Sequence, residues 1–182
     1  MNQTCSSCAF GHHALVRAAL VAGCLMLPMF AQAQPAGQLV GLFIQGCLPF
    51  AGNPPDLRAW AAQHGLAKAP EAIAKAFLHN TPGEVFDGST PDAKLALVSS
   101  DSGLCSVAID QATQADVTQA LEAGLQKAGL RYRLVIERDD KTDPAIHNRE
   151  YLAAKDNKGW RILEATVSGE AGGRAMLTAG PE

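Results

Sequence analysis

The sequence predicts an α+β fold in which N-terminal helices precede a two-layer β-β-α-β-β-β domain with an antiparallel sheet. Three observations predict it. Apolar residues between positions 38 and 78 recur at helical spacing, the segments after position 94 are short and aliphatic or alternate, and one long amphipathic segment spans positions 113–128. The chain has 182 residues, of which 47% are hydrophobic and 18% charged. That balance suits one globular domain and excludes wholesale disorder.

The first 33 residues are typical of a secretory signal. An uncharged run over positions 18–30 follows Arg17 and leads into Ala31-Gln32-Ala33, a small-x-small site for signal peptidase. The run is too short for a transmembrane anchor, which needs roughly 20 apolar residues. We therefore expect cleavage between Ala33 and Gln34, a single α+β domain over residues 34–182, and export to the periplasm.

A second reading of the same segment stays open. Val21-Ala22-Gly23-Cys24 matches a bacterial lipobox, in which Cys24 is acylated and becomes the new N-terminus. The apolar residues that continue after Cys24 favour ordinary cleavage, because lipoproteins usually turn polar there. Contact with a membrane is expected only if Cys24 is lipidated.

Removal of residues 1–33 leaves two cysteines, Cys47 and Cys105. An even pair in an oxidising compartment predicts a disulfide. The bridge would close a loop of 59 residues (105 − 47 + 1), which the chain-entropy estimate converts to about 4 kcal/mol of stability. A reactive thiol is the alternative, but neither cysteine has a neighbouring histidine or cation to lower its pKa.

The N-terminal part predicts three helices. Residues 38–47 place Leu39 and Phe43 on one stripe with Cys47, and residues 49–52 should break the helix. The second helix is expected from an Asn53 cap to about residue 64, and the third over residues 70–78.

The middle of the chain predicts a hairpin followed by a helix. Residues 94–100 and 104–110 are strand-like, and residues 101–103 suit the turn between them. Cys105 then lies on the second strand, so the disulfide would link the helices to the sheet. Thr113 and Asp116 resemble a capping box at the start of the helix over residues 113–128, and Gly129 suits its end.

The remaining third predicts three strands and a short edge strand. Residues 132–138, 150–155 and 160–168 are the expected strands, with a hairpin loop over residues 156–159. Residues 139–148 are expected to form a polar loop, and residues 175–179 a short strand at the edge of the sheet.

Charge and motifs exclude several functions. The formal net charge is −3 for the whole chain and −4 (14 − 18) after position 33. A net negative charge does not favour binding of nucleic acid. No cofactor-binding motif occurs in the sequence, so we expect no cofactor.

The densest group of residue types that bind metals consists of Asp139, Asp140, Asp143 and His147. Their spacing does not match a calcium loop, and basic residues interleave with them. We therefore expect a solvated loop and no metal site.

No motif predicts a catalytic residue, because no serine lies in a nucleophile elbow. An envelope hydrolase remains an alternative, and it would use His147 with Asp143 or Glu150. A small-ligand carrier with a cleft between helix and sheet is a further alternative.

Three short motifs, Cys47-Leu48-Pro49, Arg58-Ala59-Trp60-Ala61 and Cys105-Ser106-Val107, accompany the signal segment. Together they resemble a family of exported or lipidated bacterial envelope proteins with no assigned activity. The resemblance implies a paired Cys47 and Cys105 and an envelope location, and it implies no catalytic residue. The sequence therefore favours a periplasmic binding module, similar to an inhibitor or immunity protein, that holds an unidentified protein or small molecule.

Overall fold

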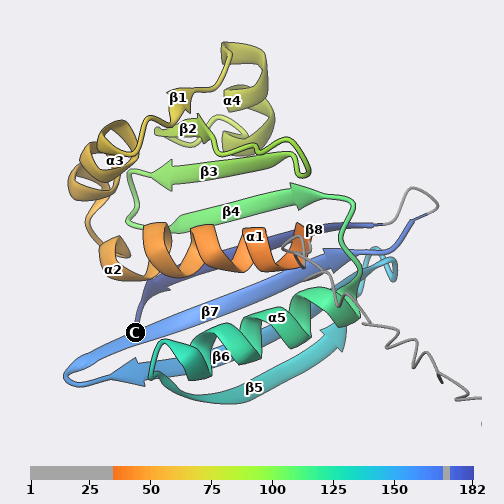
Figure 1. Cartoon of the computed structure of the whole chain (residues 1–182). Helices are drawn as coiled ribbons and strands as arrows, with labels where there is room; N and C mark the ends of the chain where they lie inside the picture. The colour runs from red at the N-terminus through yellow and green to blue at the C-terminus, as the bar shows by residue number, and fades with distance from the viewer. Residues whose placement is uncertain (1–34, 170–172) are drawn as a thin grey trace, which may run out of the picture. The chain divides into compact units, whose positions relative to one another are not determined.

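Eight strands form one antiparallel sheet in the computed structural model, which describes residues 35–169 and 173–182 (Figure 1). The strands are β1 (Ala67–Lys68), β2 (Gly83–Asp87), β3 (Leu95–Ser100), β4 (Cys105–Asp110), β5 (Arg131–Asp139), β6 (Ile146–Lys155), β7 (Lys158–Val167) and β8 (Arg174–Pro181). Their order across the sheet is β1-β2-β3-β4-β8-β7-β6-β5. The predicted α+β class with an antiparallel sheet is confirmed.

The helices are α1 (Pro35–Leu42), η1 (Phe43–Cys47), α2 (Leu48–Phe50), α3 (Pro54–Gln63), α4 (Glu71–Leu78) and α5 (Gln114–Lys127). The helix predicted over residues 38–47 therefore exists, but it is longer than expected and contains a π-helical turn, η1. The break predicted over residues 49–52 is found within that range, because the helical segment ends at Phe50, but Pro49 itself does not cause it. Pro49 lies in the first turn of α2, where its missing N–H costs no hydrogen bond, and the helix continues to Phe50.

Two predicted caps are confirmed. The side chain of Asn53 accepts a hydrogen bond from the backbone N–H of Asp56 at the start of α3. Thr113 Oγ1 accepts one from the backbone N–H of Asp116, at 3.2 Å, at the start of α5. Each cap satisfies one of the donors that a helix leaves unpaired at its N-terminus.

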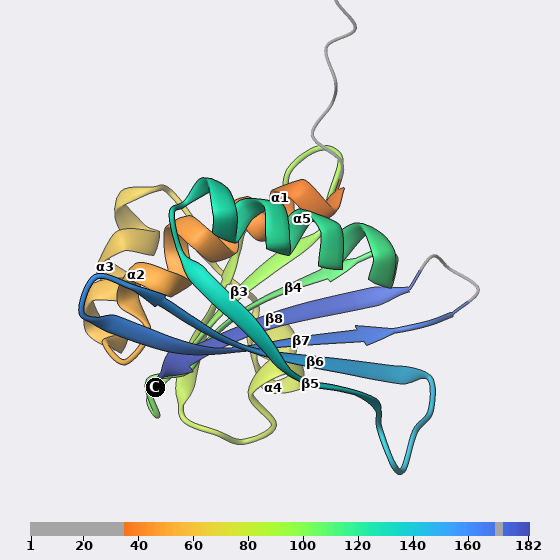
Figure 2. The same ribbon diagram turned by 90° about the horizontal axis from the view of Figure 1, so that it is seen from below.

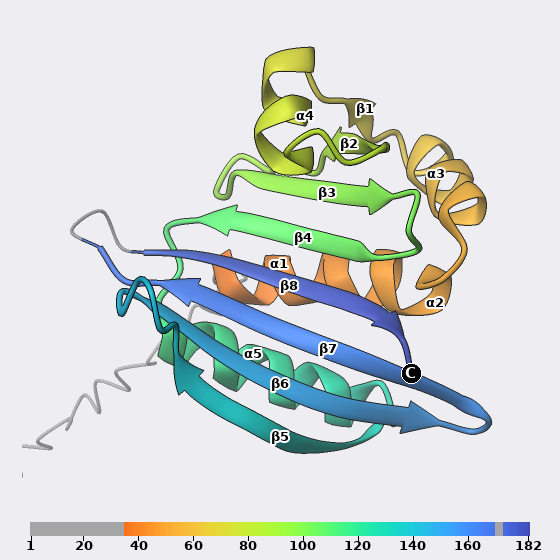
Figure 3. The same cartoon turned by 180° about the vertical axis from the view of Figure 1, so that it is seen from behind.

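The two faces of the sheet are covered unequally. Helices α1 and α5 lie together on one face, and α4 lies against the other face at the β2–β3 end (Figure 2). A Cβ on Gly88 would meet Leu42 of α1, whereas a Cβ on Gly83 would meet Leu78 of α4. We call the face covered by α1 and α5 the helix face. We call the opposite face the open face, because α4 covers only its β2–β3 corner (Figure 3).

The sequence prediction missed part of the sheet. Strands β1 and β2 were not expected, and residues 146–148, expected in a loop, are the start of β6. The segment expected at the edge is also corrected: β8 lies inside the sheet between β4 and β7. The edges are β1 and β5 instead.

The core lies between the helix face and α1, α3 and α5. Leu39, Phe43 and Leu57 from the helices and Leu97 and Ile162 from the sheet are fully buried there. The disulfide between Cys47 and Cys105 joins η1 to β4, with 5.2 Å between the Cα atoms. The expected bridge between the N-terminal helices and the sheet is therefore confirmed.

Cys24, Ala33 and Gln34, with the whole expected signal segment, lie outside the described residues. Within residues 35–169 and 173–182, no helix is long and apolar enough to cross a membrane.

Candidate functional site

The three side chains of the hydrolase alternative are not brought together. His147 lies on the helix face of β6, with Nδ1 2.8 Å from Asp139 Oδ1. Glu150 is three residues further along the same strand, so its side chain points to the open face, where it pairs with Arg161. Asp143 lies in the β5–β6 loop, and its carboxylate accepts a hydrogen bond from the backbone N–H of Ala145.

The acidic loop uses its carboxylates to fix its own backbone. Asp140 Oδ1 accepts hydrogen bonds from the hydroxyl and backbone N–H of Thr142 and from the backbone N–H of Asp143. These bonds lower the pKa of the Asp140 carboxyl, since they favour its charged form. Among the described residues, no group of three or more histidine, cysteine or acidic side chains could hold a metal ion.

A partly buried polar network beneath α5, which was not predicted from the sequence, links the helix to three strands. Glu137 on β5, Arg149 on β6 and Glu164 on β7 are direct neighbours across the sheet, in one row on the helix face. Arg149 donates to Glu137 at 2.6 Å and to Glu122 of α5 at 3.3 Å. One guanidinium therefore faces three carboxylates, an arrangement that only a delocalised, always charged side chain can serve.

The two sides of this network meet at the hydroxyl of Tyr151. Arg149 Nε donates to that hydroxyl at 2.9 Å, and the hydroxyl lies 3.1 Å from Glu122 Oε1 and 3.4 Å from Glu164 Oε2. Its single proton serves one carboxylate at a time. Burial, with a smaller contribution from the charge of Glu164, raises the pKa of Tyr151 well above its ordinary value, so the phenol stays neutral.

Glu164 is the most buried carboxyl group of the network, at 1% exposure. Burial raises the pKa of its carboxyl, and the hydrogen bond from Thr118 and the charge of Arg149 only partly oppose that shift. The network can thus hold a proton at Glu164 above the pH at which an exposed carboxyl loses it.

A polar cleft of about 640 Å³ opens above the network, lined by Thr113, Gln114, Ala115, Thr118, Gln119, Glu122 and Arg149. Its charged groups are already paired with one another, as described above. Within the described part of the chain, no serine or threonine hydroxyl is hydrogen-bonded to a histidine, so the nucleophile and base of a serine hydrolase do not meet here. The polar contacts of Thr118 and Glu122 with residues of β6 and β7 attach α5 to the sheet.

A pattern in the sequence could have indicated the network. Every second residue of β7 faces the helix side of the sheet. These residues are two apolar side chains, Trp160 and Ile162, followed by two polar ones, Glu164 and Thr166. All four are buried. A glutamate in register with buried apolar residues requires partners inside the protein, and those partners come from segments distant in sequence.

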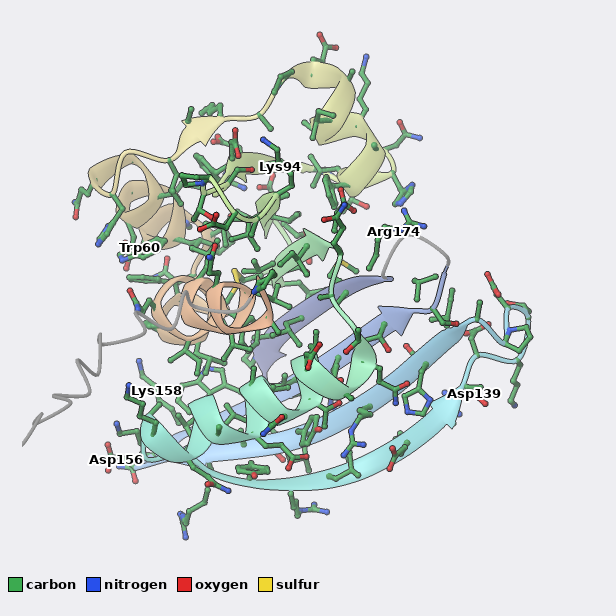
Figure 4. All side chains as sticks on the ribbon, turned by 45° about the vertical axis from the view of Figure 1, so that its right-hand side comes forward. Trp60, Lys94, Asp139, Asp156, Lys158 and Arg174 are labelled. Atoms are coloured by element: carbon green, nitrogen blue, oxygen red, sulfur yellow. A yellow bond between two sulfur atoms is a disulfide. The ribbon has the colours of Figure 1, made fainter. Side chains whose placement is uncertain are left out.

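A second, mostly apolar cleft of about 570 Å³ lies on the helix side at the other end of α5. Ile44, Leu48 and Pro49 from η1 and α2, Ala128 and Leu130 from the end of α5, and Trp160 of β7 form its walls. The β6–β7 turn, residues 155–158, forms its mouth. Asp156 and Lys158 lie together at that end of the sheet, away from Asp139 and Arg174 (Figure 4).

The open face carries most of the arginines. Alternation along the strands places five of the seven arginines that follow Ala33 on it: Arg131, Arg133, Arg138, Arg161 and Arg174. The exposed apolar side chains Ile136, Leu163 and Met176 lie between them. We call this surface the arginine face.

The carboxylates of the same surface neutralise only part of its charge. Glu150 is paired with Arg161, and Asp110 lies directly across from Arg174. Arg131, Arg133 and Arg138, all on β5, form no ion pair with any described residue. Positive charge is therefore concentrated along one strand of a chain that is negative as a whole.

Two histidines at helix ends, His64 and His79, have separate local roles. His64 ends α3, where its ring stacks on Trp60 with 4.3 Å between centroids, and His79 ends α4 in a left-handed conformation.

Comparison of the chain with protein families, with curated proteins and with solved structures finds no match.

Proposed function

We propose that this chain is an exported binding protein that holds an acidic protein partner against its arginine face. The observation that carries the proposal is the row of three arginines on β5, Arg131, Arg133 and Arg138, which form no ion pair within the described part of the chain, beside exposed apolar side chains. Isolated exposed apolar residues are ordinary on protein surfaces, but a group of them bordered by unpaired charges of one sign is typical of an interface.

Arginine suits this role better than lysine does. Its guanidinium forms two parallel hydrogen bonds with one carboxylate and loses little hydration on burial. The surface also contains small residues, Ala108 and Ala165, next to Met176 and Leu163. Small side chains let a partner approach the backbone of the sheet closely, so that the apolar groups become buried.

Binding of a polyanion tests the charge of the surface. Fluorescein-labelled poly-L-glutamate serves as the probe, and fluorescence anisotropy gives its Kd at several salt concentrations. We expect the triple variant Arg131→Glu, Arg133→Glu, Arg138→Glu to lose measurable binding. The matched control is Lys75→Glu, Lys127→Glu, Lys141→Glu, which changes the net charge equally through exposed lysines elsewhere. Equal loss in both variants would show that net charge alone is responsible.

Crosslinking in cells tests for a protein partner. A photoreactive amino acid at Leu163 or Met176 should give a discrete crosslinked species that disappears in the β5 triple variant. The same probe at exposed Ile73 of α4 should give none. Crosslinks that persist in the triple variant would contradict docking at the arginine face.

Export and lipidation form a separate part of the proposal. The expected signal segment supports them, and the intact mass of protein recovered from the envelope of an expressing bacterium tests them. A chain that begins at Gln34 supports cleavage by signal peptidase. A palmitate-labelled chain that begins at Cys24 supports the lipoprotein alternative, and an uncleaved chain contradicts both.

A further inference from the structure

We infer that the apolar cleft at the end of α5 binds a free fatty acid, with its chain between the cleft walls and its carboxylate at the β6–β7 turn. This is a second site, distinct from the arginine face. It lies on the helix side of the sheet, whereas the arginines of the other surface point to the open face, so either site can exist without the other.

The walls of the cleft suit an alkyl chain. They come from three separate segments that meet at this end of the molecule, and their six side chains are all apolar. The only hydrogen-bonding group among those side chains, the indole N–H of Trp160, is already used in a 2.8 Å bond to the backbone carbonyl of Leu48. The volume of about 570 Å³ lies in the range of small-molecule sites.

The mouth of the cleft suits an anion. Lys155 and Lys158 both border it, and neither forms an ion pair with a described carboxylate. Lys155 Nζ donates to the backbone carbonyl of Ala128 at 2.8 Å, which fixes one ammonium group at the rim. Asp156 is the one carboxylate among the lining residues, so the mouth keeps a net positive charge.

The nearby Glu182 does not alter this balance. It lies beside Gly159, where a Cβ would come 2.7 Å from its carboxylate. Gly159 and Trp160 are consecutive on β7, so they face opposite sides of the sheet. Because Trp160 faces the cleft, the Glu182 carboxylate beside Gly159 lies on the other side, away from the cleft. A chain of methylene groups that ends in a carboxylate therefore matches both the walls and the mouth.

Quenching of Trp160 fluorescence by 11-bromoundecanoate tests the site in the whole exported domain. The chain has two tryptophans, so the variant Trp60→Phe leaves Trp160 as the only emitter. We expect saturable quenching, because bromine quenches an indole only at short range. We also expect the Kd of unbrominated fatty acids to rise roughly fourfold for each methylene removed, the equivalent of about 0.8 kcal/mol per buried CH₂.

Three variants locate the ligand. Ala128→Phe should fill the cleft and weaken binding at least tenfold, and Ile44→Gln gives an independent check if the first variant lowers the Tm. Lys158→Glu should weaken binding of the carboxylate roughly threefold, as expected for an exposed charge, and should strengthen binding of dodecyltrimethylammonium. Ile73→Gln and Lys75→Glu on α4 are the matched controls and should leave the Kd unchanged.

The opposite results overturn the inference. Quenching that does not saturate, or that Ala128→Phe and Ile44→Gln leave intact, rules out the cleft. Equal affinity for the cationic and anionic amphiphiles rules out the carboxylate. Binding to phosphatidylglycerol vesicles without binding to monomeric fatty acid would show a membrane contact in place of a fatty-acid site.

Discussion

The hydroxyl of Thr118 on α5 donates a hydrogen bond to Glu164 Oε1 on β7, at 2.6 Å. This bond joins the long helix to a carboxyl group that is almost fully buried in the centre of the sheet. Because a buried carboxylate is costly unless it is hydrogen-bonded and paired, the surrounding groups determine the charge of Glu164 and, through it, part of the pH dependence of folding.

The replacement Glu164→Gln should reduce the dependence of stability on pH. The pKa of Glu164 is raised in the folded state, so its contribution to stability is fully present below the unfolded pKa and is lost as the pH rises through the folded pKa. Wild type should therefore lose stability, relative to Glu164→Gln, as the pH rises above about 4.5, the ordinary pKa of a glutamate. Urea unfolding of both proteins at a series of pH values measures this difference.

Glu122→Gln is the control for that experiment. Glu122 belongs to the same network but is much more exposed than Glu164. The change in pH dependence should therefore be largest for Glu164→Gln. The free energies of unfolding of wild type and Glu164→Gln could instead differ by the same amount at every pH. That result would show that Glu164 has the same pKa in the folded and unfolded states.

Arg149→Ala should be among the more damaging single substitutions in the sheet. It leaves Glu122, Glu137 and Glu164 without their shared cation. The Arg149 side chain is 15% exposed and its partners Glu122 and Glu137 are 36% and 44% exposed, so the loss of stability should lie between the ~1 kcal/mol of an exposed ion pair and the ~3 kcal/mol of a buried one. Arg161→Ala is the matched control, because Arg161 also pairs with a glutamate of β6 but is exposed. It should cost less than about 1 kcal/mol. Similar losses in the free energy of unfolding of the two variants would contradict the central role of Arg149.

Local sequence rules described the parts of the fold that local interactions determine. Thr113 and Asp116 identified the start of α5, and the spacing of its apolar residues identified the buried stripe with Val117 and Leu121. The turn at residues 101–103 and the cysteine pairing were predictable for the same reason. In each case a few nearby residues, or a simple count of cysteines, carry the information.

The rest of the fold depends on contacts between distant segments. The start of β6 looked like a loop because His147 and Asn148 are polar, but His147 lies on the helix face, where its Nδ1 is hydrogen-bonded to Asp139 of β5. A rule that places polar side chains in loops cannot anticipate a partner on a neighbouring strand. The position of β8 inside the sheet is likewise set by its pairing with β4 and β7, which no local pattern encodes.

The double variant Cys47→Ala, Cys105→Ala should lose a large share of the stability of the oxidised protein. The bridge joins positions that are 58 residues apart, for which the chain-entropy estimate gives about 4 kcal/mol. Both sulfurs are buried, so their loss from the core adds to the effect. Guanidinium unfolding of wild type with and without reductant, compared with the variant, measures the contribution of the bridge. A variant as stable as the oxidised protein would contradict it.

Gly124→Ala should destabilise the protein even though alanine is the better helix former. A Cβ at Gly124 would come 2.6 Å from Val40 Cγ1 and 2.7 Å from Ile44 Cδ1, where α5 crosses the first helical segment. Val40 is buried and β-branched, so its methyl group has little freedom to move. Overpacking of this kind costs about 1–3 kcal/mol, which exceeds the gain in helix propensity of about 1 kcal/mol.

Gly41→Ala separates the two effects in the same protein. Gly41 lies in α1, and a Cβ there would have no atom within 4 Å. Because only helix propensity changes, this substitution should stabilise the fold by roughly 0.5–1 kcal/mol. Opposite shifts of Tm for the two glycine variants would show that close approach of the helices, and not backbone conformation, requires a glycine at position 124. A rise in Tm for both would mean that Val40 and Ile44 move aside at little cost.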